Sequence, residues 1–538
     1  MRATPTSRAS VTVPSVPPVR RIEVVAVGVT TVAFLLLLTA YALLTPMFQA
    51  PDEPAHVDAV VQLALGHGWA DPGTLRYLNA TLAVWGAPGG GSTNPSWAAL
   101  LAAHPGTGDQ VNQMTQHPPT YYALAAALLD AVHFQHLRWD HAVLLLRFLD
   151  VAFSAALPVF AWATTRRLTA SPIAGVVAAV VVLGIPELPS IGASVTNDAP
   201  VLLLGAAVVL LVTRVLTGDD RVRTVVALGL LTGLLIVVKG TGLPAVPIVG
   251  AAVLLAGLRS QTRVVAVIRA VGVLAVAGVV GGWWWVRNLL VFHTLQPDGF
   301  TSYQPHKPFP AGTGPDLGVF LNVSWGTITR TFWGSPGQRA QFAIAPLTSA
   351  VVSIVLLVVL VGWAFRRDGR LVPAIVLTAL PVLVFAAQTW TVWRTYVDST
   401  VVGGTQGRYY YSTLVGLIAL SALAWSRLAT TGPVRRALAA TIVVLAVLVA
   451  VVGLWFVVGV FWQNGSFRPT GAGLDAFRAA APLPVRVVAV VVGALALALA
   501  ATAVVAVTAV LKRRPVPGDA LPLDSPTTVE PTVRNQTP

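Results

Sequence analysis

The chain has 538 residues, of which 55% are hydrophobic and only 10% are charged, and its mean hydropathy is +0.74. Soluble domains have about 25% charged residues, so this composition excludes an ordinary water-soluble protein. The formal net charge of +14 comes from basic residues clustered between apolar runs, which is typical of a membrane protein and predicts no nucleic-acid partner, and the lack of cysteine excludes disulfides.

Residues 1–23 are rich in Pro, Ser, Thr and Arg, which predicts a disordered cytoplasmic arm. The apolar run 24–44 is long enough to cross a hydrocarbon core of about 30 Å. It lacks a small-residue cleavage site, so we expect an anchor and not a signal peptide. Further spans are predicted at 142–165, 172–187, 199–216, 223–238, 241–257, 265–286, 342–364, 371–389, 409–426, 437–462 and 487–511. The prediction is an all-α polytopic integral membrane protein with about 12 transmembrane helices (roughly 11–13).

The basic clusters test this count, because cytoplasmic loops carry the excess of Lys and Arg. With about 12 spans, all of them fall on one side: 166–167, 219–223, 259–269, 366–370, 427–436 and 512–514. Arg486 is a mild exception. The pattern predicts both termini in the cytoplasm and the active face outside. Arginine outnumbers lysine thirty-two to three, and Ala and Val dominate the helices, a composition associated with high-GC bacteria, so the expected location is the bacterial cytoplasmic membrane. The transmembrane domain would cover 24–511 and a disordered tail 512–538.

Two outside loops are long, at 46–141 and 287–341. The first is expected to carry juxtamembrane helices. Its segment 119–132 is apolar for only about 14 residues, which predicts an interfacial or re-entrant helix instead of a span.

Soon after the first span comes the sequence PDEPAHVD, residues 51–58, with two adjacent acids at the membrane surface. Pro54 is well placed to open a helix, which would put Asp52 and Glu53 at its positive N-terminus. His56 would lie one turn beyond Asp52. The acids are candidate catalytic residues and His56 is a candidate substrate ligand; the alternative is that the acids only cap a juxtamembrane helix.

The loop closes with HPPTYY, residues 117–122. The paired prolines stop a helix and fix the direction of the chain. His117 and Tyr121 are candidate substrate-binding residues, although the tyrosines are equally explained as interfacial anchors.

These two motifs, in this order, resemble an uncharacterised family of bacterial polytopic membrane proteins, which is in turn similar to the GT-C glycosyltransferases. The resemblance spans roughly 24–430. It implies a GT-C-like fold, a polyprenyl-phosphate-sugar lipid donor and a cell-envelope glycan, lipid or protein as acceptor. It also implies an acidic base just after the first helix, which falls on Asp52 with Glu53 beside it.

Four further places carry polar residues at outside helix ends. Asn197 and Asp198 precede a helix and are also explained as an N-cap. Lys239 lies between two apolar runs. It is interpreted either as a ligand of a phosphate or as a snorkelling anchor whose ammonium reaches the membrane surface. Arg287 follows three tryptophans and would pair with a lipid phosphate. Arg408, in GGTQGRYY at 403–410, would hold a phosphate at a helix start beside Tyr409.

The leading hypothesis is an inverting membrane glycosyltransferase in which Asp52 deprotonates the acceptor and cations stabilise the departing polyprenyl phosphate. No nucleotide cofactor is expected, since the chain lacks GxxxxGK[ST]. A divalent cation on Asp52, Glu53 and His56 is a weaker possibility, because three ligands without Cys are poor evidence. The alternatives are a lipid or solute transporter or flippase, whose charges would gather at mid-membrane, and a non-catalytic protein of envelope assembly.

Overall fold

The structure is a computed structural model that describes residues 16–86, 90–297, 299 and 307–512. Of the predicted disordered arm and tail, residues 1–15 and 513–538 lie outside this part. Helix α1 runs from Arg21 to Leu44, so it begins slightly before the predicted start at 24.

Ten helical segments of the described chain are long and apolar enough to cross a membrane. They are Arg21–Leu44, Trp139–Thr169, Asp198–Leu216, Gly240–Ser260, Arg263–Phe292, Pro346–Trp363, Leu371–Ser399, Gly407–Leu428, Gly432–Trp462 and Val485–Leu511. The other two predicted spans are also apolar helices, but shorter: Pro172–Gly184 and Val222–Val238. The predicted all-α polytopic membrane class is confirmed.

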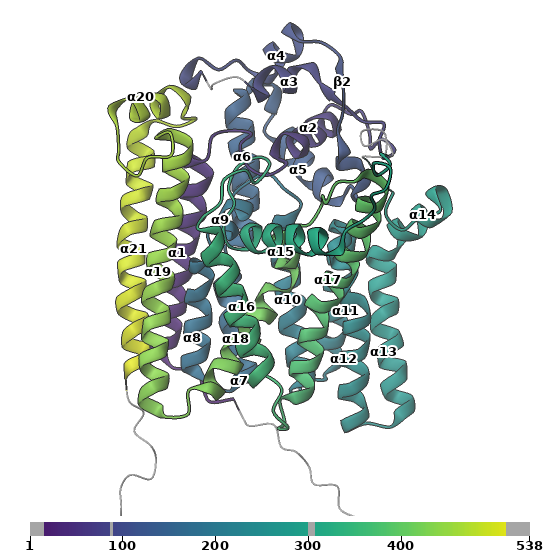
Figure 1. Cartoon of the computed structure of the whole chain (residues 1–538), viewed down its shortest axis with the longest axis vertical. Coiled ribbons are helices and arrows are strands. Elements are labelled where there is room, and N and C mark those ends of the chain that lie inside the picture. The colour runs from purple at the N-terminus through teal and green to yellow at the C-terminus, as the bar shows by residue number, and fades with distance from the viewer. Residues whose placement is uncertain (1–15, 87–89, 298, 300–306, 513–538) are drawn as a thin grey trace, which may run out of the picture.

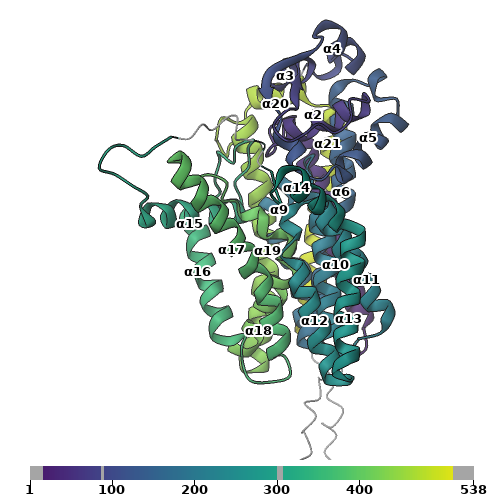
Figure 2. The same cartoon turned by 90° about the vertical axis from the view of Figure 1, so that its right-hand side faces the viewer.

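The long helices of the bundle run along one axis (Figures 1 and 2). The bounds of the bundle elements are α1 Arg21–Leu44, α6 Trp139–Ser154, α7 Leu157–Thr169, α8 Pro172–Val181, η4 Val182–Gly184, α9 Glu187–Gly192, α10 Asp198–Leu216, α11 Val222–Val238, η5 Gly240–Gly242, α12 Ala245–Ser260, α13 Arg263–Ala277, the π-turn η6 Gly278–Gly282, α14 Trp283–Phe292, α16 Pro346–Trp363, α17 Leu371–Ser399, η7 Gly407–Thr413, α18 Leu414–Leu428, α19 Gly432–Trp462 and α21 Val485–Leu511. Helix α14 projects sideways from the end of α13 (Figure 1). Helix α17 continues to Ser399 instead of ending near 389, and it contains Pro381.

A cap of short elements covers one end of the bundle (Figure 1). It comprises α2 Glu53–Ala64, β1 Arg76–Leu78, α3 Asn79–Trp85, η1 Gly91–Thr93, α4 Trp97–Ala103, β2 Thr107–Val111, η2 Gln113–Gln116, α5 Thr120–Ala131 and η3 Phe134–His136. Strands β1 and β2 pair antiparallel. The first long loop thus carries short helices, as predicted, and α5 has only 12 residues, too few to span.

The buried carboxylate of Asp58 holds this cap together. It accepts hydrogen bonds from the backbone N–H of Leu78 (3.0 Å) and from the side chains of Gln62 (2.7 Å) and Asn112 (2.9 Å). Burial raises its pKa to about 6. Because Asp58 lies on α2, these bonds fix the helix that follows the paired acids against the strand pair.

Two further helices lie at the capped end. Helix α15, Leu317–Trp333, runs across the bundle and not along it, and α20, Gly471–Ala480, lies at the capped ends of α19 and α21 (Figure 1). The capped ends of α1 and α19 meet where the indole of Trp462 donates to the carbonyl of Leu44 at 2.7 Å.

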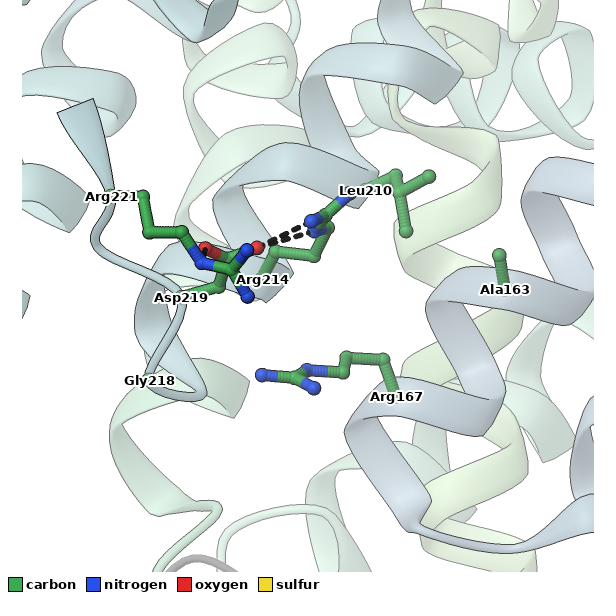
Figure 3. A pocket seen from close by; sticks show the side chains of 7 residues that line it. All are labelled: Ala163, Arg167, Leu210, Arg214, Gly218, Asp219 and Arg221. Atoms are coloured by element: carbon green, nitrogen blue, oxygen red, sulfur yellow. Dashed lines mark hydrogen bonds and ion pairs between the residues drawn. The ribbon is translucent and has the colours of Figure 1, made fainter. Parts of the chain in front are cut away.

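At the opposite end the predicted basic clusters come together, which we call the basic end. Arg166 at the end of α7 pairs with Glu23 at the start of α1 (2.8 Å). Arg214, Asp219 and Arg221 form ion pairs where α10 turns into α11 (Figure 3). The Arg166–Glu23 pair joins two of the segments that the charge pattern assigned to one side.

Candidate functional site

The acids Asp52 and Glu53 open α2, but the backbone turns their side chains to different partners. Pro54 occupies the first turn of α2, as predicted. Asp52 is the N-cap residue, its φ of 56° lies in the left-handed region, and its side chain makes no cap hydrogen bond. That conformation costs an Asp on the order of 1 kcal/mol. The capping alternative therefore does not describe Asp52.

Glu53 is fully buried in a two-pronged ion pair with Arg147 of α6, with both N···O distances at 2.7 Å. Its carboxylate also accepts the backbone N–H of Phe48 at 2.9 Å. The remaining N–H groups of the Arg147 guanidinium donate to the backbone carbonyls of Ala42, Thr45 and Pro46. Both oxygens of Glu53 are thus occupied in a clamp between α1, α2 and α6, which holds the backbone next to Asp52.

Asp52 instead pairs with Arg408 on η7, far along the chain. The Asp52 side chain is 37% exposed and that of Arg408 is 8% exposed. A solvent-accessible carboxylate therefore lies against a buried cation. Two glycines allow this approach. A Cβ on Gly407 would lie 2.3 Å from backbone atoms of α15, and one on Gly205 of α10 would lie 2.4 Å from the carbonyl of Ser412.

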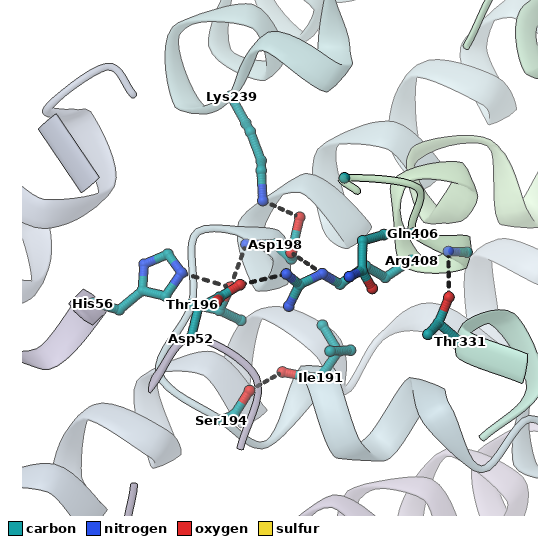
Figure 4. A network of polar contacts seen from close by, with 12 residues as sticks. Asp52, His56, Ile191, Ser194, Thr196, Asp198, Lys239, Thr331, Gln406 and Arg408 are labelled. Atoms are coloured by element: carbon teal, nitrogen blue, oxygen red, sulfur yellow. Dashed lines mark hydrogen bonds and ion pairs between the residues drawn. The ribbon is translucent and has the colours of Figure 1, made fainter. Parts of the chain in front are cut away.

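Asp198 and Lys239 complete a cluster of four charges with Asp52 and Arg408, which we call the charge cluster (Figure 4). Lys239 Nζ lies 2.7 Å from Asp198 Oδ1, and Arg408 Nε lies 3.7 Å from Asp198 Oδ2. The ring of Tyr409 lies 5.7 Å from the Lys239 ammonium and 5.9 Å from the Arg408 guanidinium. Helices α2 and α10, the α11–η5 junction and η7 each supply one charge.

Two buried histidines lie beside this cluster. His56 Nδ1 lies 3.0 Å from the Tyr122 hydroxyl, and its Nε2 lies 3.4 Å from the Thr196 hydroxyl. Burial, and then the charge of Lys239, hold the pKa values of His56 and His117 well below the ordinary range. Both imidazoles are therefore neutral at pH 7 and can exchange hydrogen bonds but add no charge.

Several buried polar atoms around the cluster have no hydrogen-bond partner within the described residues. They are Nε and Nη1 of Arg408, Oδ2 of Asp198, both side-chain amide atoms of Asn197 and Nδ1 of His117. Asn197 is the N-cap residue of α10, yet its side chain makes no cap bond. Unpaired buried donors cost about 1–3 kcal/mol each. Donors from a guanidinium and an amide, gathered at a helix start, suit an anion with several oxygens.

Two predicted site residues lie apart from the cluster. The hydroxyl of Tyr121 donates to Asp150 of α6 at 2.8 Å. Arg287 on α14 pairs with Asp71 at 3.1 Å and lies over the ring of Trp284. Both contacts join elements of the cap and bundle to each other.

The residues considered for a divalent cation also separate. Glu53 faces Arg147, His56 faces Tyr122 and Asp52 faces Arg408. Among the described residues, no group of three or more His, Asp or Glu side chains is close enough together to hold a metal ion.

Sequence reasoning missed Arg147 and Asp150. Asp150 is fully buried and accepts from the Thr196 backbone N–H at 2.8 Å as well as from Tyr121. The available signal was an Arg and an Asp three positions apart inside an apolar span, because ionisable residues within a span need partners there.

Residues 35–296 match the family model described as Predicted membrane protein (DUF2142). The predicted resemblance to an uncharacterised membrane protein family is confirmed over that range. The matched range is shorter than the expected range 24–430, and Arg408 lies outside the matched range. No curated protein sequence matches the chain.

Solved structures similar to this chain include the following three. ArnT from Cupriavidus metallidurans, bound to undecaprenyl phosphate, has 15% identity and a TM-score of 0.43, covering 90% of this chain and 77% of its own. The Archaeoglobus fulgidus oligosaccharyltransferase has 13% identity and a TM-score of 0.42, covering 85% and 57%. The Mycobacterium smegmatis arabinosyltransferase EmbB has 13% identity and a TM-score of 0.40, covering 91% and 41%. At TM-scores below 0.5 these likenesses carry no argument about activity.

Proposed function

We propose that the protein is a membrane glycosyltransferase that moves a sugar from a polyprenyl-phosphate donor to a hydroxyl of a cell-envelope glycan, lipid or protein. The observation that carries the proposal is the partly exposed carboxylate of Asp52 above the buried guanidinium of Arg408, which has unpaired donors. A transferase of this kind needs a base reachable by the acceptor and cations for the departing phosphate. The charge cluster offers both within one group of side chains.

In this mechanism Asp52 accepts the proton of the acceptor hydroxyl, while the oxygen of that hydroxyl attacks the anomeric carbon of the sugar. The bond from that carbon to the phosphate oxygen breaks, and polyprenyl phosphate leaves with the bonding electrons. Arg408 and Lys239 stabilise the negative charge on the leaving group. A positioned base contributes roughly 10²–10⁴-fold to the rate.

The remaining residues of the site have positioning or binding roles in the proposal. Asp198 orients Lys239, and the amide of Asn197 and the neutral rings of His56 and His117 offer hydrogen bonds to donor or acceptor. Tyr409 contacts both cations with its ring. Glu53 supports the base through its clamp with Arg147. Tyr121 and Arg287 are given no part in the chemistry.

The proposal includes the orientation that the basic clusters predict. The basic end would face the bacterial cytoplasm, and the cap and charge cluster would face outside. There a lipid-linked donor is already activated, so no nucleotide is needed.

The test is transfer of radiolabelled sugar from polyprenyl-phosphate donors in membranes that contain the wild-type chain, Asp52→Asn or Asp109→Asn. Asp109 is an exposed aspartate of the same cap and serves as the matched control. We expect label to enter lipid or polymer with the wild type and Asp109→Asn, and a loss of at least roughly 100-fold with Asp52→Asn. If no donor supports transfer and Asp52→Asn still complements a deletion strain, a transporter or a non-catalytic envelope protein is the better description.

A further inference from the structure

A cavity of about 330 Å³ opens at the basic end, far from the charge cluster and between α7 and α10 (Figure 3). Three of its lining residues are arginines and one is an aspartate, and the other three are an alanine, a leucine and a glycine. The lining residues are Ala163, Arg167, Leu210, Arg214, Gly218, Asp219 and Arg221. The proposed transfer chemistry does not involve this cavity.

The ion pairs leave the cavity with an excess of positive charge. The Asp219 carboxylate forms ion pairs with two arginines. One is Arg214, and the other is Arg221, whose Nε lies 3.3 Å from it. Arg167 donates only to neutral acceptors, the hydroxyl (2.7 Å) and carbonyl (2.9 Å) of Thr217. Three arginines against one carboxylate give a formal charge of +2 in this lining.

On each wall, partly exposed apolar residues at helical spacing precede the cavity arginine, and we call each set an apolar track. On α7, Phe160 and Ala163 precede the cavity arginine on one face of the helix, and both are partly exposed. On α10, Leu203 and Leu210 precede Arg214 in the same way and are also partly exposed. Because both helices end within a turn of these arginines, the apolar residues lie deeper along the bundle, where acyl chains would be.

We propose that this cavity binds the headgroup phosphate of an anionic membrane phospholipid, with its acyl chains along the two tracks. The positive rim complements the phosphate, and arginine pairs with phosphate through two parallel N–H donors. The apolar tracks favour a lipid over free phosphate, because a soluble anion would gain nothing from them. The volume is adequate for a small headgroup. The site does not depend on the proposed transferase activity.

The test uses the purified full chain in detergent and native mass spectrometry with added dioleoyl phosphatidylglycerol, dioleoyl phosphatidylcholine or inorganic phosphate. We expect the wild type to retain phosphatidylglycerol in preference to phosphatidylcholine. Arg167→Gln and Arg214→Gln should each weaken that binding roughly fivefold, since a basic residue near a lipid surface contributes about that factor. Arg263→Gln, at the exposed start of α13 on the same end, removes one charge outside the cavity and should change nothing.

A second variant separates the lipid from a simple anion. Ala163→Phe keeps every charge and obstructs the α7 track, so it should also weaken phosphatidylglycerol binding, whereas Arg167→Lys should recover part of the loss seen in Arg167→Gln. The proposal is overturned if the wild type does not distinguish the two lipids, if Arg263→Gln loses as much as Arg167→Gln, or if Ala163→Phe binds like the wild type. It is also overturned if inorganic phosphate at equal concentration displaces the lipid.

Discussion

The ion pairs around the charge cluster at the capped end differ in exposure from those of the cavity at the basic end, although one pair at the basic end, Arg166–Glu23, is also buried. At the capped end, Glu53, Arg147, Asp198 and Lys239 are almost completely removed from solvent and paired through short contacts. At the basic end, the side chains of Arg214 and Arg221 are 40% and 62% exposed and share one aspartate. Exposed pairs contribute about 0–1 kcal/mol, whereas burying ions costs several kcal/mol each before pairing offsets it.

This difference indicates what each end is for. A buried ion pair is often no more stabilising than apolar residues of the same volume, so stability alone does not account for the capped end. Preorganised charges in a water-poor site do suit a reaction in which negative charge develops. The exposed arginines of the basic end suit contact with water and lipid headgroups. Four variants would break or sharpen this comparison.

Arg147→Met should have the largest effect on stability. It would leave the Glu53 carboxylate buried without its ion-pair partner, which costs about 3–5 kcal/mol. The measurement is the thermal unfolding midpoint of the detergent-purified protein. Glu53→Gln combined with Arg147→Met should recover part of the loss, because the amide is neutral. An unchanged midpoint for Arg147→Met alone would show that this pair is not a clamp.

More of the fold than of the candidate site can be predicted from the sequence. The spans and the basic clusters follow from local composition, so one sequence suffices to predict them. The PDEPAH motif pointed to Asp52, and the separate motifs around Asp198, Lys239 and Arg408 pointed to residues that the fold brings together. Their mutual pairing depends on how four distant segments pack, and no local pattern encodes that.

Packing also explains why the structure separates residues that the sequence motifs had grouped. Because Asp52 and Glu53 are adjacent in the sequence, both were expected to have the same role. The backbone of Asp52 is in the left-handed region, which turns the two carboxylates away from each other. The partner that occupies Glu53 lies 94 positions along the chain. Tyr121 was selected from its motif, and its actual partner, Asp150, was hidden inside a predicted span.

Lys239→Met should reduce sugar transfer, under the proposed function, by roughly 10²–10³-fold in kcat, the range for losing one preorganised charge-stabilising group. Lys307→Met is the matched control, because Lys307 is one of only three lysines and is exposed. A fall confined to KM would assign Lys239 to ground-state binding instead. Equal activity of both variants would remove Lys239 from the site.

The buried histidines predict a stability loss in mild acid. Burial holds the pKa values of His56 and His117 below their ordinary value of 6.5, so below pH 6.5 the unfolded chain binds protons that the folded chain does not. Their contribution is complete above pH 6.5 and is lost as the pH falls towards the folded pKa. Asp58, whose pKa is raised to about 6, has the opposite effect over the same range, so the histidine effect is measured as a difference. Between pH 7 and 5 we expect the unfolding midpoint of the wild type to fall relative to that of His56→Gln. An identical pH dependence in that variant would contradict a neutral, buried His56.

Arg221→Gln should have the smallest effect. Its side chain is 62% exposed, it lies 3.3 Å from Asp219, and Arg214 still pairs with that carboxylate in the variant. We expect the unfolding free energy to change by no more than about 0.5 kcal/mol, within the range of exposed ion pairs. The measurement is the same unfolding midpoint, at low and at high salt, because screening weakens exposed pairs selectively. A loss comparable to that of Arg147→Met would mean that charge at the basic end is as tightly integrated as at the capped end, and the contrast between the two ends would fail.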